Sequence, residues 1–379
     1  MMMITNLPDA IAGVAGLAQD LVRIDSRSFR PNAPIADRLE SAIAAIPDLD
    51  LERIDYTDAA GVAKRVLIAA RGEHGLALSG HMDTVPDTGW TDDPWSGRID
   101  SDGVLHGLGS ADMKGPVAAI VAAAASLPPE TPVCLLITTD EETTKAGARA
   151  IVERSRLARA AAPRGIVVAE PTRMQPVRGH RSSILFVATA TGVQAHSSTG
   201  RGVNANWAVA PFLMAMRDIH DRVRHAPEWQ NPAYDPPFGD FNLVIDNHGA
   251  AVNVTVPRAT VQIKFRHAAG LDPAPLIAAV RAAADAVGMA LEIFEEGPPP
   301  ELPADHPLIV AALAATGKRA AGTAPYGTDA VILQSLAPCV VLGPGDIALA
   351  HTPDEHVRLA DLAAAVPILA DLAHRVAAG

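Results

Sequence analysis

The stretch LALSGHMDTVPDTGW, residues 76–90, places a histidine and a carboxylate directly after an apolar run. The run has the pattern of a buried strand, and His81 and Asp83 follow it before Pro86 ends any regular pairing. The residues that directly follow buried parallel strands lie together at one edge of the sheet, where α/β proteins bind their ligands. The stretch therefore predicts a functional site at a strand end in an α/β fold.

The same rhythm continues along the chain. Short apolar runs (VLIAA, VCLLITT, GIVVA) alternate with alanine-rich helical patterns near 116–126 and 147–156. This alternation predicts an α/β domain with a mostly parallel central sheet. After about Gly179 the order becomes strand, helix, strand, strand, helix, strand, which is the βαββαβ order of a ferredoxin-like sandwich.

The segment GPPPELP follows the second pattern and reads as a linker, because three successive prolines cannot sit inside a helix or a sheet. Beyond it, a helix, the strand PCVVLG and a helix from about Asp361 resume the first pattern. We therefore expect a larger discontinuous domain, residues 1–178 and 297–379, interrupted by an inserted domain at 179–296.

Composition limits the class of protein. A chain of 379 residues suits two domains, and a formal net charge of −12 argues against nucleic acid or an anionic membrane as a partner. No apolar run is long enough to cross a bilayer, and the N-terminus reads as an amphipathic helix and not as a signal peptide. Two cysteines without CxxC spacing fit a reducing cytoplasm.

Seven acidic and histidine residues fall at expected strand ends or in glycine- and proline-rich loops. Each alone has a simple structural explanation, such as a solvated helix start. Together they favour a metal site, because zinc-like ions prefer imidazole and carboxylate ligands, and two adjacent ions need a bridging carboxylate. The seven residues are His81, Asp83, Asp112, Glu141, Glu142, Glu170 and His351.

Six segments, in order, resemble one enzyme family. They are SGHMDTVP, LHGLGSADMKG, DEETTKAGAR, AEPTRMQPVRGHRS, AHSSTGRGVNA and GPGDIALAHTPDEH. They are similar to the co-catalytic zinc amidohydrolase and peptidase family, which includes acetylornithine deacetylase, succinyl-diaminopimelate desuccinylase, aminoacylases and glutamate carboxypeptidases. The resemblance spans almost the whole chain and implies a zinc-peptidase-like catalytic domain with an inserted lid and dimerisation domain.

The resemblance also implies two divalent metal ions per subunit, with zinc expected and cobalt or manganese possible. Asp112 would bridge the two ions. His81 and Glu170 would complete one site, and Glu142 and His351 would complete the other.

Two further acids receive roles by the same resemblance. Asp83 would accept a hydrogen bond from the far ring nitrogen of His81 and fix its tautomer. Glu141 would be the general base that takes a proton from the attacking water and passes it to the leaving amine. The structural alternative for Glu141 is an acid that merely caps a helix beside Glu142.

Three residues of the inserted domain match positions that act on substrate in relatives. His196 would hydrogen-bond the oxyanion in the active site of a partner subunit, which requires a homodimer. The alternative is that His196 caps the following helix. Asn253 and Arg266 would bind the substrate carboxylate, for which a planar guanidinium is suited.

Two departures from the family pattern flank that arginine. Lys264 stands where relatives often have an acid, and His267 stands where they have proline. Alternation along the strand places Lys264 and Arg266 on one face, which suits either a more acidic substrate or a solvated surface. Thr328 could bind substrate and Asp329 a substrate ammonium, or the pair could start a helix.

The resemblance is strongest to acetylornithine deacetylase, notably in GLGSADMKG and EPTRMQPVRGH. It implies hydrolysis of N-acetyl-L-ornithine to ornithine and acetate in arginine biosynthesis. The alternatives are the same mechanism on N-succinyl-diaminopimelate, an N-formyl or N-carbamoyl amine, or a dipeptide, and a non-catalytic binding protein. A serine hydrolase lacks support because no GxSxG elbow is present, and GLGSAD does not have the spacing of a nucleotide-binding loop.

Overall fold

The computed structural model describes residues 7–379, with side chains from Gly13 onward. The helix expected at the N-terminus is α1 (Leu7–Val22), and residues 1–6 lie outside the described part of the chain. The chain forms two units. Unit 1 comprises Met1–Gly179, Pro300–Gly322 and Thr328–Gly379, and unit 2 comprises His180–Pro299 and Thr323–Gly327.

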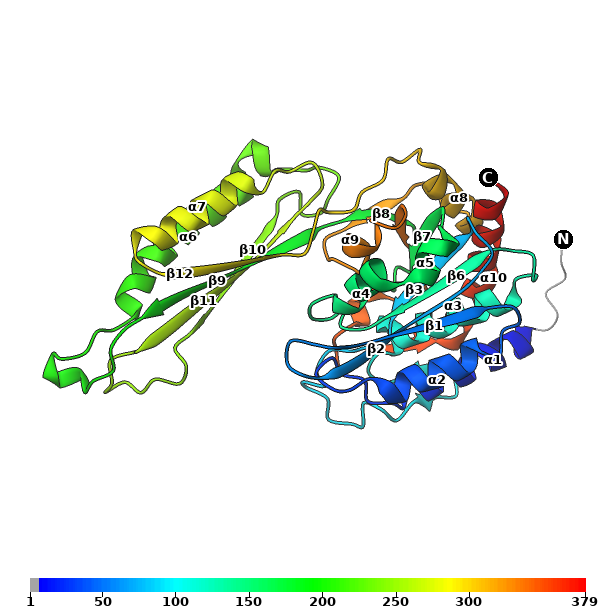
Figure 1. Ribbon diagram of the computed structural model, residues 1–379, viewed down its shortest axis with the longest axis horizontal. Coiled ribbons are helices and arrows are strands. Elements are labelled where there is room, and N and C mark those ends of the chain that lie inside the picture. The colour runs from blue at the N-terminus through cyan, green and yellow to red at the C-terminus, as the bar shows by residue number, and fades with distance from the viewer. Residues whose placement is uncertain (1–6) are drawn as a thin grey trace. The chain divides into compact units, whose positions relative to one another are not determined.

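An eight-stranded sheet forms the centre of unit 1 (Figure 1). Its order is β1-β2-β6-β3-β7-β14-β8-β13. Neighbours from β6 to β14 run parallel, whereas β1–β2, β2–β6 and β14–β8 are antiparallel, so the sheet is mixed with a parallel centre. The strand bounds are β1 Asp50–Thr57, β2 Ala63–Arg71, β3 Leu76–His81, β6 Val133–Thr138, β7 Gly165–Val168, β8 Val177–His180, β13 Gly322–Ala324 and β14 Cys339–Val341.

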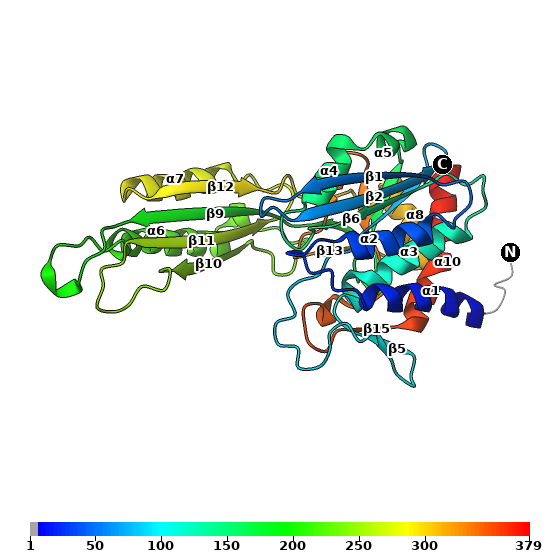
Figure 2. The same cartoon turned by 60° about the horizontal axis from the view of Figure 1, so that its bottom comes forward.

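Helices cover both faces of this sheet, which explains why every residue of β3 and β6 is buried. Figure 2 shows α4 and α5 on one face and α1, α2, α3 and α10 on the other. The remaining helix bounds of unit 1 are α2 Ala33–Ile43, α3 Gly115–Ser126, α4 Ala146–Arg154, α5 Arg156–Ala161, α8 Pro307–Thr316, α9 Ala330–Leu333 and α10 Leu359–Ala378.

Close packing of α3 on β3 positions the strand that ends at His81. The helix is almost entirely apolar and buried, with alanine as its main residue. A Cβ on Gly80 would lie 2.8 Å from Val117 Cγ2 and 2.9 Å from the Met113 methyl group, so any larger residue would have to displace these two side chains. The backbone beside His81 is therefore held firmly by the core.

Parallel register brings the carboxyl ends of three strands together. His81 pairs with Thr138 of β6, and Ser79 pairs with Val168 of β7. A second, three-stranded sheet has the order β15-β5-β4, with β4 at Arg98–Ile99, β5 at Val104–His106 and β15 at His356–Arg358. It holds the segments around Asp112 and His351 next to each other.

Unit 2 is a four-stranded antiparallel sheet of order β10-β11-β9-β12. With the chain order βαββαβ, this is the ferredoxin-like topology that the sequence predicts, and the prediction is confirmed. The buried side chains of α6, including Phe212 and Met216, pack on the sheet. The bounds are β9 Ser182–Thr191, α6 Asn206–His225, β10 Asp240–Asp246, β11 Arg258–His267, α7 Ala274–Ala286 and β12 Ala290–Glu295.

Within residues 7–379, the helices lack the combination of length and apolar character that crossing a bilayer demands.

The buried strands of unit 1 allow a test of the core. Leu135 of β6 is fully buried, so Leu135→Ala should lower the free energy of unfolding by about 2–5 kcal/mol through the cavity it leaves. Val310→Ala is the control, because Val310 is 52% exposed on α8, and we expect a change within about 0.5 kcal/mol. Urea unfolding of both variants measures the difference, and equal losses would contradict the buried-sheet assignment.

Candidate metal centre

Three neighbouring strands of unit 1 deliver acidic and imidazole side chains to one edge of the sheet. His81 is the last residue of β3, Glu170 follows β7 by two residues, and Glu141 and Glu142 follow β6. Their side chains are largely buried, with 1% of His81 and 4% of Glu170 exposed. Asp140 turns the chain after β6 with a φ of 61°, which aims the next two residues back toward His81.

Asp112 lies between the two histidines of the cluster. Its Oδ1 is 3.1 Å from His81 Nε2, and its Oδ2 is 3.3 Å from His351 Nε2. His351 Nε2 is also 3.0 Å from Glu142 Oε1. Since each oxygen of Asp112 faces a different imidazole, this carboxylate has the arrangement of a bridge between two ions.

The described residues include one group whose potential ligand atoms lie within 4.8 Å of one another, namely His81, Asp112 and Glu142. His351 contacts two members of this group, and Glu170 is buried close enough for the charge of Asp112 to raise its pKa. The structure thus brings all five expected metal ligands to one place.

The ionisation of these groups shows how strongly the site favours a cation. Burial, together with the charge of Asp112, raises the pKa of Glu142 to about 7. Burial opposes protonation of His81, but hydrogen bonds to Asp112 and Asp83 outweigh it and raise the pKa of that imidazole well above its usual value. Two imidazoles and several crowded carboxylates form a donor set that suits borderline divalent ions.

Asp83 has a different contact with His81 from the expected one. The nearest oxygen to His81 Nδ1 is the backbone carbonyl of Asp83 at 2.9 Å, and the carboxylate Oδ1 lies at 3.5 Å. The same tautomer results, because either oxygen accepts the proton on Nδ1.

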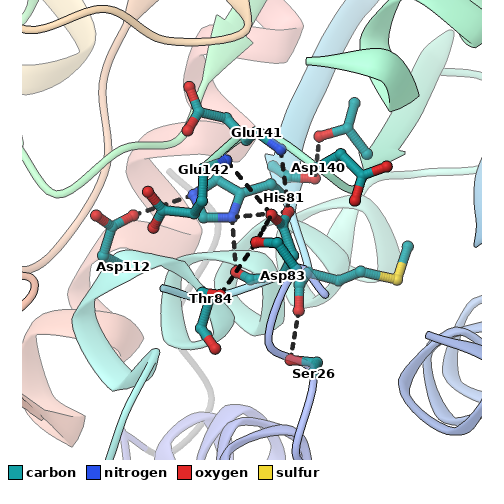
Figure 3. A network of polar contacts seen from close by, with 12 residues as sticks. Ser26, His81, Asp83, Thr84, Asp112, Asp140, Glu141 and Glu142 are labelled. Atoms are coloured by element: carbon teal, nitrogen blue, oxygen red, sulfur yellow. Dashed lines mark hydrogen bonds and ion pairs between the residues drawn. The ribbon is translucent and has the colours of Figure 1, made fainter. Parts of the chain in front are cut away.

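The carboxylate of Asp83 instead organises the loop after β6 (Figure 3). Its Oδ1 accepts from the backbone N–H of Glu141 at 3.2 Å, and its Oδ2 accepts from that of Glu142 at 3.3 Å. Ser28 donates its hydroxyl to Oδ2 at 2.8 Å. Asp83 therefore positions a histidine through its backbone and two glutamates through its side chain.

Glu141, the expected general base, is ion-paired with a residue that the sequence analysis missed. Lys145 Nζ lies 2.9 Å from Glu141 Oε1, and both side chains are buried. The spacing of four residues was the available signal, because residues i and i+4 commonly meet where the chain enters a helix. This pairing holds the Glu141 carboxylate in place.

A second buried pair supports the turn at Asp140. Lys64 Nζ lies 2.9 Å from Asp140 Oδ1, and the Tyr56 hydroxyl donates to Asp140 Oδ2 at 2.7 Å. Lys64 also donates to the backbone carbonyls of Ser28 and Arg30. Strands β1 and β2 are therefore tied to the loop that carries Glu141.

Thr328 and Asp329 lie at the start of α9, and their expected contacts with substrate stay predictions. Thr328 is fully buried, and its hydroxyl accepts from the backbone N–H of Ala330 at 3.1 Å. Asp329 Oδ2 accepts a hydrogen bond from the Thr138 hydroxyl at 2.5 Å. Thr328 thus bonds within the start of α9, and Asp329 joins α9 to the end of β6.

Unit 2 contains the other three expected residues, and it brings two of them together. Ser197 donates its backbone N–H to the carbonyl of Asn253 at 2.9 Å, and His196 forms a bridge with Val254. His196 Nδ1 accepts from the backbone N–H of Ser198 at 3.3 Å, which caps a short 3-10 turn. That bond leaves the proton on Nε2, the tautomer that can donate to an anion.

Arg266 and Lys264 share the solvent side of β11, as the alternation predicts. Each has an acidic neighbour: Arg266 lies 2.6 Å from Asp240, and Lys264 lies 3.5 Å from Glu296. His267 faces the opposite, buried side and stacks on Phe265 with ring centroids 5.5 Å apart. His267 is therefore a packing residue of unit 2.

Comparisons with known proteins agree with this geometry. Residues 77–375 match the model of peptidase family M20/M25/M40. The chain is 34% identical to an acetylornithine deacetylase of Proteus mirabilis, over 76% of each chain. It is 31% identical to an acetylornithine deacetylase of Myxococcus xanthus, over 96% of this chain and 97% of the relative.

Solved structures share the fold. The dipeptidase Dug1p of Saccharomyces cerevisiae matches all of both chains with a TM-score of 0.75 at 12% identity. Human carnosine dipeptidase 1 matches 98% of both chains with a TM-score of 0.74 at 16% identity. A tripeptidase of Staphylococcus aureus covers 97% of this chain and 99% of its own, with a TM-score of 0.73 at 19% identity.

The raised carboxyl pKa values predict how stability depends on pH. Burial and nearby charges raise the pKa values of Glu142 and Asp329 to about 7. Between about pH 5 and pH 7 the folded protein then binds more protons than the unfolded chain. We expect the free energy of unfolding of chelated protein to fall across this range, by up to about 1.4 kcal/mol per pH unit for each such proton.

His351 acts in the same direction at higher pH, because hydrogen bonds to Asp112 and Glu142 raise its pKa to about 11. Urea unfolding at a series of pH values, with chelator and with added zinc, measures both effects. Zinc should remove the loss, since a cation replaces the protons. A chelated protein whose stability rises between pH 5 and pH 7 would contradict the crowded-carboxylate description.

Proposed function

This chain belongs to peptidase family M20/M25/M40, and on that premise we propose that it hydrolyses the amide bond of an N-acyl amino acid, first of all N-acetyl-L-ornithine. Membership makes the chain a hydrolase of a metal-dependent family. The observation that carries the proposal is the placement of Asp112 between His81 and His351, with Glu141 on the adjoining loop. The same proposal includes a role for this enzyme in arginine biosynthesis in the cytoplasm.

The five clustered residues would hold two divalent ions, of which zinc is the candidate. Asp112 would bridge them, with His81 and Glu170 on one ion and Glu142 and His351 on the other. Bound there, the ions would polarise the acyl carbonyl and make water acidic enough to react near neutral pH. The crowding of carboxylates supports this assignment, because a cation removes their mutual repulsion.

Glu141 is the proposed general base. Its carboxylate would accept the proton of the attacking water and transfer it to the nitrogen of the leaving amine. The ion pair with Lys145 and the backbone bond to Asp83 hold it in place on its loop. Amide hydrolysis needs both proton transfers, because an amine anion is too poor a leaving group.

Arg266 is the residue proposed to bind the substrate carboxylate. It lines a pocket of about 400 Å³ within unit 2, together with Arg181, His220 and Arg224. Arg181 is 3% exposed, and its Nε lacks a hydrogen-bond partner among the described residues. A guanidinium with an unused buried donor favours a carboxylate ligand.

The same pocket favours a second candidate substrate class. Several cationic side chains around one cavity suit a substrate with more than one carboxylate, such as N-succinyl-diaminopimelate. Asp240 offsets part of this charge through its ion pair with Arg266. Both candidate substrates would be hydrolysed at the same metal centre, and they differ only in the groups that this pocket would bind.

A homodimer is part of the proposal. Arg266 pairs with Ser183 at the start of β9, whereas His196 and Asn253 lie beyond the end of that strand. Ten residues of β9 span roughly 30 Å, so these residues lie at opposite ends of unit 2. One substrate can contact both only if the partner subunit's His196 reaches the site.

The surface of unit 2 supports such pairing. Trp207 and Met214 of α6 are 79% and 58% exposed, although large apolar side chains are normally covered. The edge strand β10 exposes Val244 and Ile245 as well. A second copy of this chain would cover these side chains.

A substrate panel tests the function. We expect purified, zinc- or cobalt-loaded protein to release amine from N-acetyl-L-ornithine, and chelator to abolish the release. N-succinyl-diaminopimelate, N-acetylmethionine, N-formyl amines and dipeptides run in parallel. Activity confined to N-succinyl-diaminopimelate would replace the first candidate by the second, and inactivity on every compound would overturn the deacylase proposal.

Glu141→Gln is the mechanistic control for this panel. It should bind metal like the wild type and lose about 10²- to 10⁴-fold in kcat, because only the proton acceptor is removed. Turnover within about twofold of wild type would remove Glu141 from the mechanism.

Mixed dimers test the shared site. His196→Ala and Glu141→Gln should each be inactive as homodimers. If His196 acts across the interface, a purified dimer with one chain of each kind has one intact site and about half of the wild-type activity. An inactive mixed dimer would place His196 in its own subunit's site.

A further inference from the structure

Glu355 lies four residues after His351, just before β15, and is 1% exposed. Among the described residues its carboxylate takes part in no ion pair of 4 Å or less. A buried carboxylate without a paired cation is costly unless hydrogen bonds stabilise its charge. The hydrogen bonds of the Glu355 carboxylate therefore show what stabilises its charge.

Three backbone N–H groups of the Asp112 segment donate to this carboxylate. Oε1 accepts from Ala111 and from Asp112, both at 2.9 Å, and Oε2 accepts from Gly109 at 3.0 Å. The backbone carbonyl of Glu355 also accepts from the N–H of Gly107 at 3.2 Å. One residue thus holds a segment more than 240 positions away in the sequence.

The Asp112 segment forms a short, irregular π-helical turn, Ser110–Lys114, in which the N–H of Lys114 donates to the carbonyl of Gly109 at 2.7 Å. Gly109 has a φ of 82°, and Asp112 departs from helical geometry with φ −124° and ψ 93°. N–H groups in such a backbone lack the partners that a helix supplies and need acceptors from elsewhere. The carboxylate of Glu355 provides them at the residue that faces both histidines.

We propose that Glu355 is the positioning residue of the metal centre: by holding the backbone of Asp112, it sets how tightly the centre binds metal. The inference rests on the proposed two-metal site. Because Glu355 and His351 lie on one segment, the loop that supplies one ligand also fixes another. Groups that orient metal ligands in this way typically change metal affinity by about 10- to 100-fold when they are altered.

Glu355→Gln tests the proposal with little change in volume. The amide keeps one oxygen but turns an NH₂ group toward at least one backbone donor. At least one of the three hydrogen bonds from Gly109, Ala111 and Asp112 is therefore lost. Glu52→Gln is the matched control, because Glu52 accepts from the N–H groups of Arg156 and Leu157 and from the Ser155 hydroxyl at a helix start that carries no proposed ligand.

Two measurements on purified protein separate positioning from general stability. Zinc titration in competition with a chromophoric chelator should show about 10- to 100-fold weaker binding for Glu355→Gln and a change within about twofold for Glu52→Gln. Amide hydrogen exchange of chelated protein should speed up at Gly109, Ala111 and Asp112 in the first variant only.

The outcomes are distinct. A wild type that binds no zinc would overturn the metal centre itself. Wild-type zinc affinity in Glu355→Gln, or equal weakening in Glu52→Gln, would overturn the role of Glu355 alone. If Glu355→Gln does not fold, Glu355→Asp replaces it in the test, because aspartate keeps the charge but moves it away from the backbone N–H groups. Weakened zinc binding with a normal far-UV circular dichroism spectrum supports the positioning role of Glu355. Normal zinc binding excludes that role.

Discussion

Burial of several carboxylates at one site is the constraint on which the rest of unit 1 depends. Asp112, Glu141, Glu142 and Glu170 share one edge of the sheet. Burial, together with the charge of Asp112, raises the pKa values of Glu142 and Glu170, which shows the cost of holding these groups together. Such crowding persists only in a framework rigid enough to resist it. Strands β3 and β6, buried along their whole length, supply that framework.

The site is assembled in layers of support around the acidic cluster. Asp83 fixes His81 through its backbone and the two glutamates through its side chain. Lys145 and Lys64 each hold one acid of the following loop, and Glu355 holds the backbone of Asp112. Four residues of the proposed site are thus oriented by other buried polar groups, which limits motion where the chemistry needs fixed distances. They are His81, Asp112, Glu141 and Glu142.

In the proposed mechanism, unit 2 would bind the substrate through residues on a separate sheet. Its ferredoxin-like sheet carries Arg266 near one end and His196 with Asn253 beyond the other. The strand between them is too long for one small molecule to contact all three residues of the same copy. If all three act on one substrate, two copies must share the site. Substrate choice would then depend on the arginine pocket, while the bond-breaking chemistry stays with unit 1.

The sequence alone determined the elements and the inventory of reactive groups. Period-two and period-3.6 patterns are local, so the βαββαβ order, the alternation in β11 and the strand that ends at His81 could all be predicted. Expected strand ends and loops singled out seven acidic and histidine residues, and the family resemblance implied which five of them are ligands. Only the tertiary structure decided which partner each group has: the mixed edges of the sheet, the pairing of Glu141 with Lys145, the choice of the Asp83 backbone oxygen, and the three bonds of Glu355. The bonds of Glu355 join segments up to 246 residues apart through individual atoms, and no local pattern of residues encodes such a meeting.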